Sequence, residues 1–119
     1  MLMAGNYRCI RRDDMIPIKD AVHADVDKSR AVYDWVWKVC TSLGATDDDM
    51  VPFDKYALAA EGLRKPSSAA RALFGGAEHI ERVDCLIRRI ARQRGFRSDT
   101  LDEIVTLVDE RLGMNRRPA

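Results

Sequence analysis

The sequence predicts an all-α protein, a single-domain bundle of four to five helices with an N-terminal arm. Apolar residues recur at the 3.6-residue period of an α-helix through most of the chain, and capping residues or glycines stand where the periodic segments begin or end. The connections between these segments are only a few residues long, which favours helices that pack against their neighbours in sequence. With 119 residues, the chain has the usual length of one domain with one core.

Residues 1–17 are the predicted arm. The segment YRCIRRDDMIPI has no sustained helical period, and Pro17 keeps the residue before it out of the α region. We expect this arm to be extended, to add a short strand to a partner, or to cross to a second subunit. The helical domain then covers residues 18–113, and residues 114–119 are expected to be a flexible tail.

The first long helix is expected to begin between Asp20 and Asp25 and to end at Leu43, where Gly44 closes it in a left-handed conformation. Either Asp25 caps this helix or the segment before it is a separate turn. One apolar face, spaced alternately by four and three residues, consists of Val22, Val26, Ser29, Tyr33, Val36, Cys40 and Leu43. We expect this helix to lie at the centre of the bundle.

Two shorter helices are predicted next. Pro52 suits the first turn of one of them. The expected buried side of that helix is Phe53, Tyr56, Ala57, Ala60 and Leu63. Ser67 or Ser68 then caps the segment AARALF, which stops at Gly75 and Gly76.

The last two predicted helices are the longest after the first. One covers about residues 77–94 and ends at Gly95, and the other covers about residues 99–112, with Ser98 as its cap and Gly113 as its end. The expected buried positions of the earlier helix are Ile80, Val83, Ile87, Ile90 and Ala91. Those of the later helix are Leu101, Ile104, Val105, Val108 and Leu112.

Composition limits the classes of function. Lysine and arginine number 20 against 19 acidic residues, so the whole molecule has little field with which to attract nucleic acid or anionic lipid. Three scattered cysteines form neither a disulfide framework nor a zinc motif. We therefore expect reduced thiols and, with no apolar stretch of signal-peptide or membrane-spanning length, a cytoplasmic protein. The excess of arginine over lysine, 15 to 5, suggests a bacterial or phage gene.

Trp35 and Trp37 lie about 100° to either side of Val36, so the apolar arc of their helix spans roughly 200°. One neighbouring helix cannot cover so wide an arc. Either this helix is surrounded by the others, or one flank docks on a second copy or another protein, because aromatic and arginine side chains are enriched at interface centres. Leu86 also lies off the buried face of its own helix, which favours a shared surface.

The segment LIRRIARQRGFR concentrates arginines on the fourth predicted helix. Acidic residues in its first turns and basic residues in its last turns match the helix dipole, which predicts an ordinary solvated face. The acidic last helix could neutralise these arginines, or they could bind a complementary partner. The predicted protein interface consists of Trp35, Trp37, Leu86, Arg82, Arg88, Arg89 and Arg92.

A nucleic-acid-binding regulator is the alternative. The short helix, the glycine pair and the following basic helix have the order of a helix-turn-helix, but Glu78 and Glu81 would meet phosphates with the wrong sign. The residues expected to contact DNA or RNA in this case are Arg8, Arg11, Arg12, Arg89, Arg92, Arg94 and Arg97.

No motif indicates catalysis, a metal site or a cofactor. The glycine pair lacks the lysine and serine of a phosphate-binding loop, and the contiguous residues 47–49 lack the alternation of a calcium loop. We therefore expect a non-enzymatic regulatory or adaptor protein, of the inhibitor or anti-activator type. It would bind another protein, such as a transcription factor or an enzyme, through helical surfaces. We expect it to be a homodimer when free and to bind no membrane.

Overall fold

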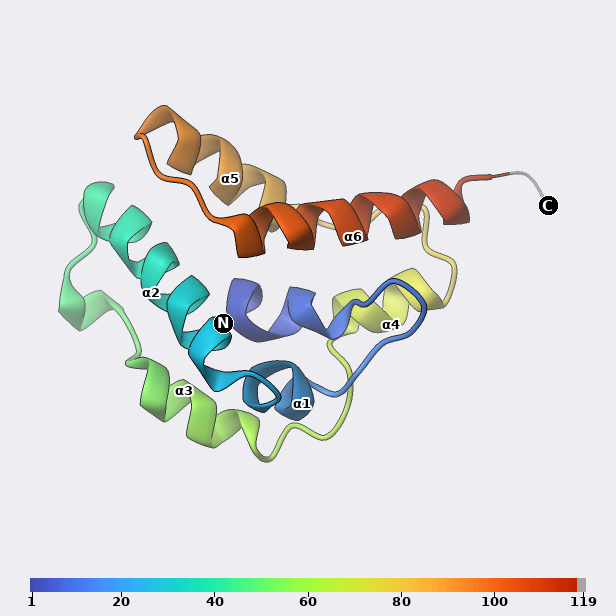
Figure 1. The fold of residues 1–119 in the computed structure, drawn as a ribbon, viewed down its shortest axis with the longest axis horizontal. Helices are drawn as coiled ribbons and strands as arrows, with labels where there is room; N and C mark the ends of the chain where they lie inside the picture. The colour runs from blue at the N-terminus through green and yellow to red at the C-terminus, as the bar shows by residue number, and fades with distance from the viewer. Residues whose placement is uncertain (118–119) are drawn as a thin grey trace.

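The computed structural model describes residues 1–117 and confirms the all-α class (Figure 1). Within this range the only extended pairing is an isolated bridge between Ile10 and Met15. The α-helices are α1 (Ile18–His23), α2 (Val26–Ser42), α3 (Phe53–Ala60), α4 (Ser68–Phe74), α5 (Val83–Gln93) and α6 (Asp99–Asn115). Shorter helical turns are η1 (Leu2–Asn6), η2 (Tyr7–Cys9) and η3 (Asp47–Asp49). The described part thus holds more helical elements than the four to five expected.

The N-terminal segment lies in the core, so the prediction of an arm is wrong for residues 2–10. Its side chains Met3, Tyr7 and Ile10 are each at most 4% exposed. The η1 turn contacts α1, α2, α4 and α5, and Figure 1 shows it at the centre of the molecule, where α2 was expected. Packing explains the difference, because a helix too short to be stable alone forms when its apolar side is buried.

The junction before α2 satisfies both alternatives that the sequence left open. Residues Ile18–His23 form the separate helix α1, and the side chain of Asp25 caps α2 by accepting a hydrogen bond from the backbone N–H of Lys28 at 3.1 Å. At the other end, Gly44 has a φ of 104°, the left-handed conformation predicted for it.

The start of α5 differs from its prediction. Residues 77–82 are not helical, and the phenol of Tyr7 fixes the point where α5 begins. Its hydroxyl donates to the carbonyl of Glu81 at 2.7 Å and accepts from the N–H of Val83 at 3.0 Å. A side chain 76 positions away in sequence thus supplies a capping contact that local reading could not provide.

The helix α6 continues past Gly113 to Asn115, so the predicted tail is wrong for residues 114–115. Asn115 donates through Nδ2 to the carbonyls of Leu73 and Ala77, both at 2.8 Å, and this attaches the end of α6 to the end of α4. Residues 118–119 lie outside the described part. The buried face of α6 is as predicted, and Ser98 caps its start by accepting from the N–H of Leu101.

The short α3–α4 region follows its prediction in most respects. Ser67 caps α4 by accepting from the N–H of Ala70 at 3.2 Å, and Gly76 with φ 98° lies just past its end. Leu63, expected to be buried, is 44% exposed because α3 ends before it. The molecule measures 47 × 35 × 20 Å, and its thickness corresponds to two helix diameters. No helix within residues 1–117 has the length and apolar character to cross a bilayer.

Candidate functional site: an apolar groove between α2 and α5

A groove of about 440 Å³ runs between α2 and α5, with the N-terminal turn as its floor. We call it the α2–α5 groove. It is lined by Met1, Leu2, Met3, Ala4, Tyr33, Val36, Trp37, Cys40, Asp49, Met50, Val51, Val83 and Ile87. All of these except Asp49 carry an apolar or aromatic side chain or a thiol, so the groove suits an apolar ligand surface.

The wall from α2 is built by helical spacing. Tyr33, Val36, Trp37 and Cys40 are three or four residues apart in sequence or adjacent, so they share one side of the helix. Tyr33 fixes the facing loop, because its hydroxyl donates to the carbonyl of Val51 at 2.5 Å. The ring of Tyr33 stacks on that of Tyr56 with centroids 5.5 Å apart, and burial raises the pKa of the Tyr33 phenol. This wall is therefore supported from behind by the core.

The two tryptophans lie on opposite flanks of α2 and have different surroundings. Trp35 is half-buried and packs against the core, and its Nε1 is buried with no acceptor within the described residues. Trp37 lines the groove, where its Nε1 donates to Oδ1 of Asp47 at 3.1 Å. Of the two indoles predicted to form an interface, only that of Trp37 is placed in the groove.

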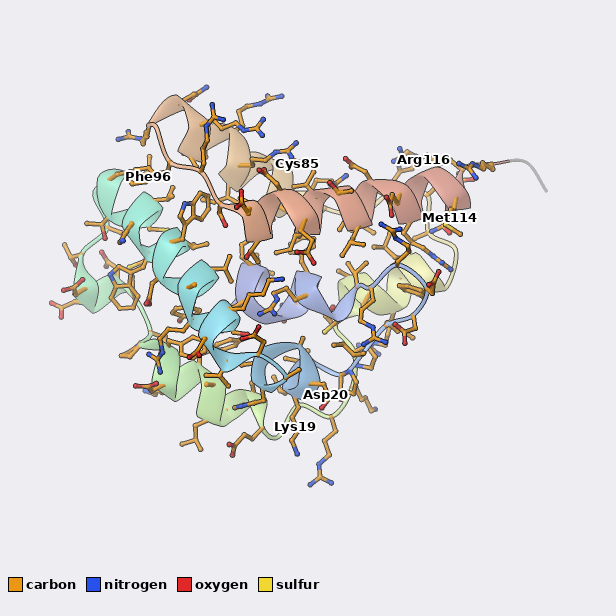
Figure 2. All side chains as sticks on the ribbon, in the orientation of Figure 1. Lys19, Asp20, Cys85, Phe96, Met114 and Arg116 are labelled. Carbon is orange, nitrogen blue, oxygen red and sulfur yellow. The ribbon has the colours of Figure 1, made fainter. Side chains whose placement is uncertain are left out.

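The opposite wall belongs to α5. Val83 and Ile87 face the groove, and Leu86 lies about 60° around the helix from Val83. Leu86 is 56% exposed, so it extends the apolar surface beyond the rim. At the far end, Arg94 donates through Nη1 to the carbonyl of Ser42 at 2.7 Å, which ties the C-terminal end of α5 to that of α2. Figure 2 shows Phe96 in the following connection near this same end.

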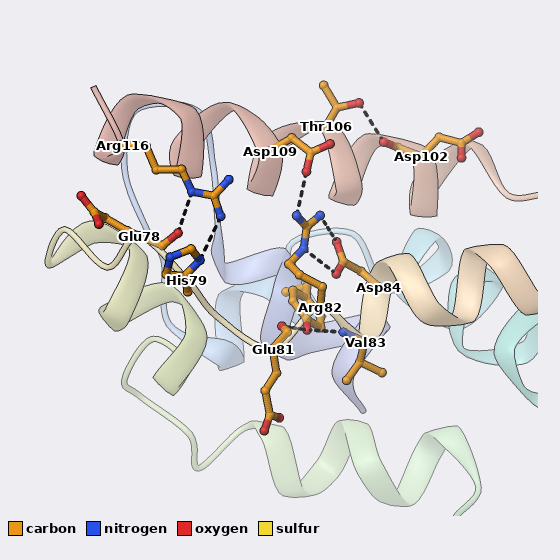
Figure 3. A network of polar contacts seen from close by, with 11 residues as sticks. Glu78, His79, Glu81, Arg82, Val83, Asp84, Asp102, Thr106, Asp109 and Arg116 are labelled. Carbon is orange, nitrogen blue, oxygen red and sulfur yellow. Dashed lines mark hydrogen bonds and ion pairs between the residues drawn. The ribbon is translucent and has the colours of Figure 1, made fainter. Parts of the chain in front are cut away.

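Arg82 was predicted to contact a partner, but it is part of an internal ion network (Figure 3). It makes two hydrogen bonds of 3.0 Å to the fully buried carboxylate of Asp84 and one of 2.7 Å to Asp109 on α6. Burial by itself would lower the Arg82 pKa, but these hydrogen bonds raise it above its ordinary value. The network is needed because Asp84 has no contact with water.

The remaining predicted arginines of α5 are divided between α6 and solvent. Arg88 and Arg92 lie 3.7 and 3.5 Å from the same carboxylate oxygen of Asp102 on α6. Arg89 is exposed and makes no ion pair within residues 1–117. We call the contacts of Arg82, Arg88 and Arg92 with Asp84, Asp102 and Asp109 the α5–α6 seam. One alternative from the sequence was that the acidic last helix neutralises the arginines of the predicted interface. This holds for Arg82, Arg88 and Arg92 but not for Arg89.

The arginines of the nucleic-acid alternative do not form one surface. Arg11 pairs with Asp14 at 2.5 Å, and Arg12 lies 3.5 Å from Glu110 on α6. Arg12 and Arg92 therefore pair with different parts of α6, because Glu110 and Asp102 are eight residues, or about 12 Å, apart along the helix axis. Arg8 is half-buried and hydrogen-bonds to Ser29, while Arg94 bonds to Ser42 and Arg97 is exposed with no ion pair in the described part.

The thiols and histidines have structural surroundings. All three cysteines are unpaired, and burial raises the pKa of both Cys9 and Cys85, which disfavours a reactive thiolate. His23 bonds through Nε2 to the carbonyl of Ala57 at 2.7 Å, and His79 contacts Arg116. In the described part of the chain, no three His, Cys, Asp or Glu side chains gather as a metal site would require.

Sequence reasoning missed the floor of the groove, because it assigned residues 1–4 to an arm. The signal that could have found it is the spacing of Met3, Tyr7 and Ile10, which are four and three residues apart like one face of a helix. The intervening Arg8 and the following arginines hid this pattern. Comparison with protein-family models, curated proteins and solved structures finds no match to this chain.

Proposed function

We propose that this chain is a non-enzymatic regulatory or adaptor protein that binds another protein through the α2–α5 groove. The observation that carries the proposal is the gathering of exposed apolar side chains there. Met1, Leu2 and Val51 line the groove while being 62%, 41% and 40% exposed, and Leu86 beside it is 56% exposed. A small domain leaves such a contiguous patch open mainly where another molecule covers it.

The expected occupant is an amphipathic helix of the partner protein. Two helices wall the groove and η1 forms its floor, so an added helix would pack against α2 and α5 as helices do in grooves of this kind. Arg89 lies on the rim of α5 beyond Leu86 and has no ion partner within residues 1–117. The partner helix should therefore carry a carboxylate on its flank, because the arginine fork binds carboxylates well.

The mechanism we infer is occlusion. The bound helix would be one that the partner, such as a transcription factor or an enzyme, needs for its own contacts, and covering it would inhibit the partner. The protein would work in the cytoplasm, an inference that its three unpaired cysteines support.

A matched pair of variants tests the groove. Leu86→Glu places a charge beside the groove, and Leu58→Glu places one on the 67% exposed Leu58 of α3, outside the groove. The immobilised protein is used to capture binding proteins from a host extract. Proteins that bind both the wild type and Leu58→Glu should not bind Leu86→Glu or Trp37→Ala. Each protein lost in this way is then purified and titrated against the three variants. If both groove variants retain every protein that the wild type retains, the groove is not the binding site.

We also propose that the free protein is a homodimer in which the groove of each copy is covered by the other. Light scattering after size exclusion should then give twice the 13.5 kDa mass of the chain. Leu86→Glu should shift it to the mass of one chain, and Leu58→Glu should not. A wild type of 13.5 kDa at all concentrations contradicts this part of the proposal and leaves the first experiment unaffected.

The nucleic-acid alternative has no observation in its favour, because five of its seven arginines already bond within the chain. Its test is a salt titration with duplex DNA. Neutralising about five phosphates would give a log-log slope of roughly −4 to −5 in affinity against salt. We expect no measurable binding at low salt.

A further inference from the structure

A second cavity of about 400 Å³ lies between the N-terminal segment, α1 and α6, and it shares no lining residue with the groove. We call it the Arg8 cleft. Its lining combines cationic side chains, those of Arg8, Arg12 and Lys28, with apolar ones, those of Ile16, Ile104 and Leu107. A cavity with an apolar wall and a few converging polar groups is the usual form of a small-molecule site.

Arg8 is held in the cleft by buried groups. Its Nη1 donates to Oγ of Ser29 and, at 3.4 Å, to the carbonyl of Ala4. Ser29 is fully buried and is itself fixed by donating to the carbonyl of Val22 at 2.8 Å. One edge of the guanidinium is therefore anchored by the protein, and its direction in the cleft is set.

The other edge of the same guanidinium is open. No acceptor for Nε or Nη2 of Arg8 occurs in residues 1–117, and no carboxylate of that range lies within ion-pair distance. Arg8 is half-buried, and this burial lowers its pKa. Arginine still remains protonated in proteins. Asp25 and Glu103 act on this charge only from beyond ion-pair distance. A carboxylate that hydrogen-bonds directly to the open edge would therefore stabilise it further.

The charges around Arg8 favour a ligand with a single negative charge. Arg12 pairs with Glu110, Lys28 with Glu103 at 3.1 Å, and the lining residue Arg11 with Asp14. Among the cationic side chains that line the cleft, only Arg8 is in no ion pair. Asp20, which also lines the cleft, adds a negative charge. A dianion such as a phosphate monoester would therefore be repelled more than a carboxylate.

We propose that the Arg8 cleft binds a small carboxylic acid with a short apolar body. The carboxylate accepts two hydrogen bonds from Nε and Nη2 of Arg8, in the bidentate geometry that arginine and carboxylate share. The hydrocarbon part packs against Ile104 and Leu107, where it leaves water.

Hexanoate is the probe for this site, with three ligands as controls. Acetate has the charge without the body, 1-hexanol has the body without the charge, and hexyl phosphate is the dianion. Calorimetric titration of the full chain at constant ionic strength should show hexanoate binding at least tenfold more tightly than each control. Equal affinity for hexanoate and hexanol, or for hexanoate and acetate, would overturn the proposal.

Two variants assign the binding to Arg8. Arg8→Lys keeps the charge but loses the bidentate fork, so hexanoate affinity should fall about tenfold. Thr100→Glu places a competing carboxylate in the cleft at the start of α6, a helix position that tolerates acidic residues well. It should fold and lose hexanoate binding, while Thr100→Gln retains it. If Arg8→Lys does not fold, the Thr100 pair decides, and equal hexanoate affinity in both overturns the proposal.

Discussion

The two sides of α5 differ in how far their side chains are used within the fold. On the seam, arginines pair with partly exposed carboxylates of α6 and with the fully buried carboxylate of Asp84. On the groove side, the same helix presents Val83 and Ile87, which are partly buried against the core, and Leu86, which is 56% exposed. The difference teaches that a run of arginines beside apolar residues is not by itself an interface. The apolar side is partly exposed, and most arginines of the basic side are already paired within the fold.

Breaking the seam should have the largest effect on stability. Asp84→Asn leaves Arg82 partly buried without the charge of its buried carboxylate partner, and removing one partner of a buried pair costs about 3–5 kcal/mol. Urea unfolding followed by circular dichroism measures the loss. Asp109→Asn is the control, because Asp109 bonds the same arginine but its side chain is 59% exposed, and we expect a loss below about 1 kcal/mol. Equal losses in the two variants would show that burial of Asp84 is not the cause.

The two tryptophans should separate stability from binding. Trp35→Ala removes a side chain packed on the core, and its cost should approach the roughly 3 kcal/mol typical of large aromatic truncations. Trp37→Ala removes a groove side chain that is not packed on the core, so its cost should be below about 1 kcal/mol. Binding of the partner should be lost with Trp37→Ala and largely kept with Trp35→Ala. If Trp35→Ala unfolds the protein, Trp35→Phe gives the same ranking of stability on a smaller scale.

Alkaline pH should destabilise the protein through its buried tyrosines. Burial raises the pKa of Tyr56 to about 12, from an ordinary value of 10, and Tyr33 on the wall is raised in the same direction. Since the unfolded phenol loses its proton first, the free energy of unfolding should fall as the pH rises from about 10 to about 12. Urea midpoints across this range measure the slope, and Tyr56→Phe should reduce it. An unchanged slope in Tyr56→Phe would assign the loss to other groups.

The smallest expected changes in stability come from substituting single arginines of α5. Arg88→Gln breaks a partly exposed pair with Asp102, so it should cost about 0.5 kcal/mol and less at high salt. Arg89→Gln should change stability by less, because Arg89 has no ion pair within residues 1–117, but it should weaken binding of an acidic partner helix. Thermal unfolding at two salt concentrations measures the first change. A salt-dependent loss for Arg89→Gln of the same size would contradict the distinction.

The sequence predicts which segments are helical better than it predicts where they lie in the fold. Helical periodicity and local caps were sufficient for the starts of α2, α4 and α6, because Asp25, Ser67 and Ser98 make contacts within three residues of their own positions. The start of α5 and the place of the N-terminal segment depend on contacts between distant residues, such as the phenol of Tyr7 with Val83. No local pattern encodes such contacts.

The candidate site was predicted in part for the same reason. The wide apolar arc of α2 correctly indicated more surface than one neighbour covers, and Trp37 with Leu86 lies in or beside the groove. Trp35 is instead packed on the core, and Arg82 is inside an ion network. Which flank of a helix faces outward depends on the packing of the other helices, and periodicity alone does not give this.

The position of η1 also has a consequence for biosynthesis. Residues 2–10 leave the ribosome well before their partners, since Asn6 bonds to Ser67 and Tyr7 to residues 74 and 76 positions later. A nascent chain shorter than about 83 residues can pack this segment against α1, α2 and α4, but it lacks the contacts of α5 and α6. Enclosure of this segment is complete only after α5 and α6 are made, so a ribosome that stalls earlier should release a product that chaperones hold or proteases degrade.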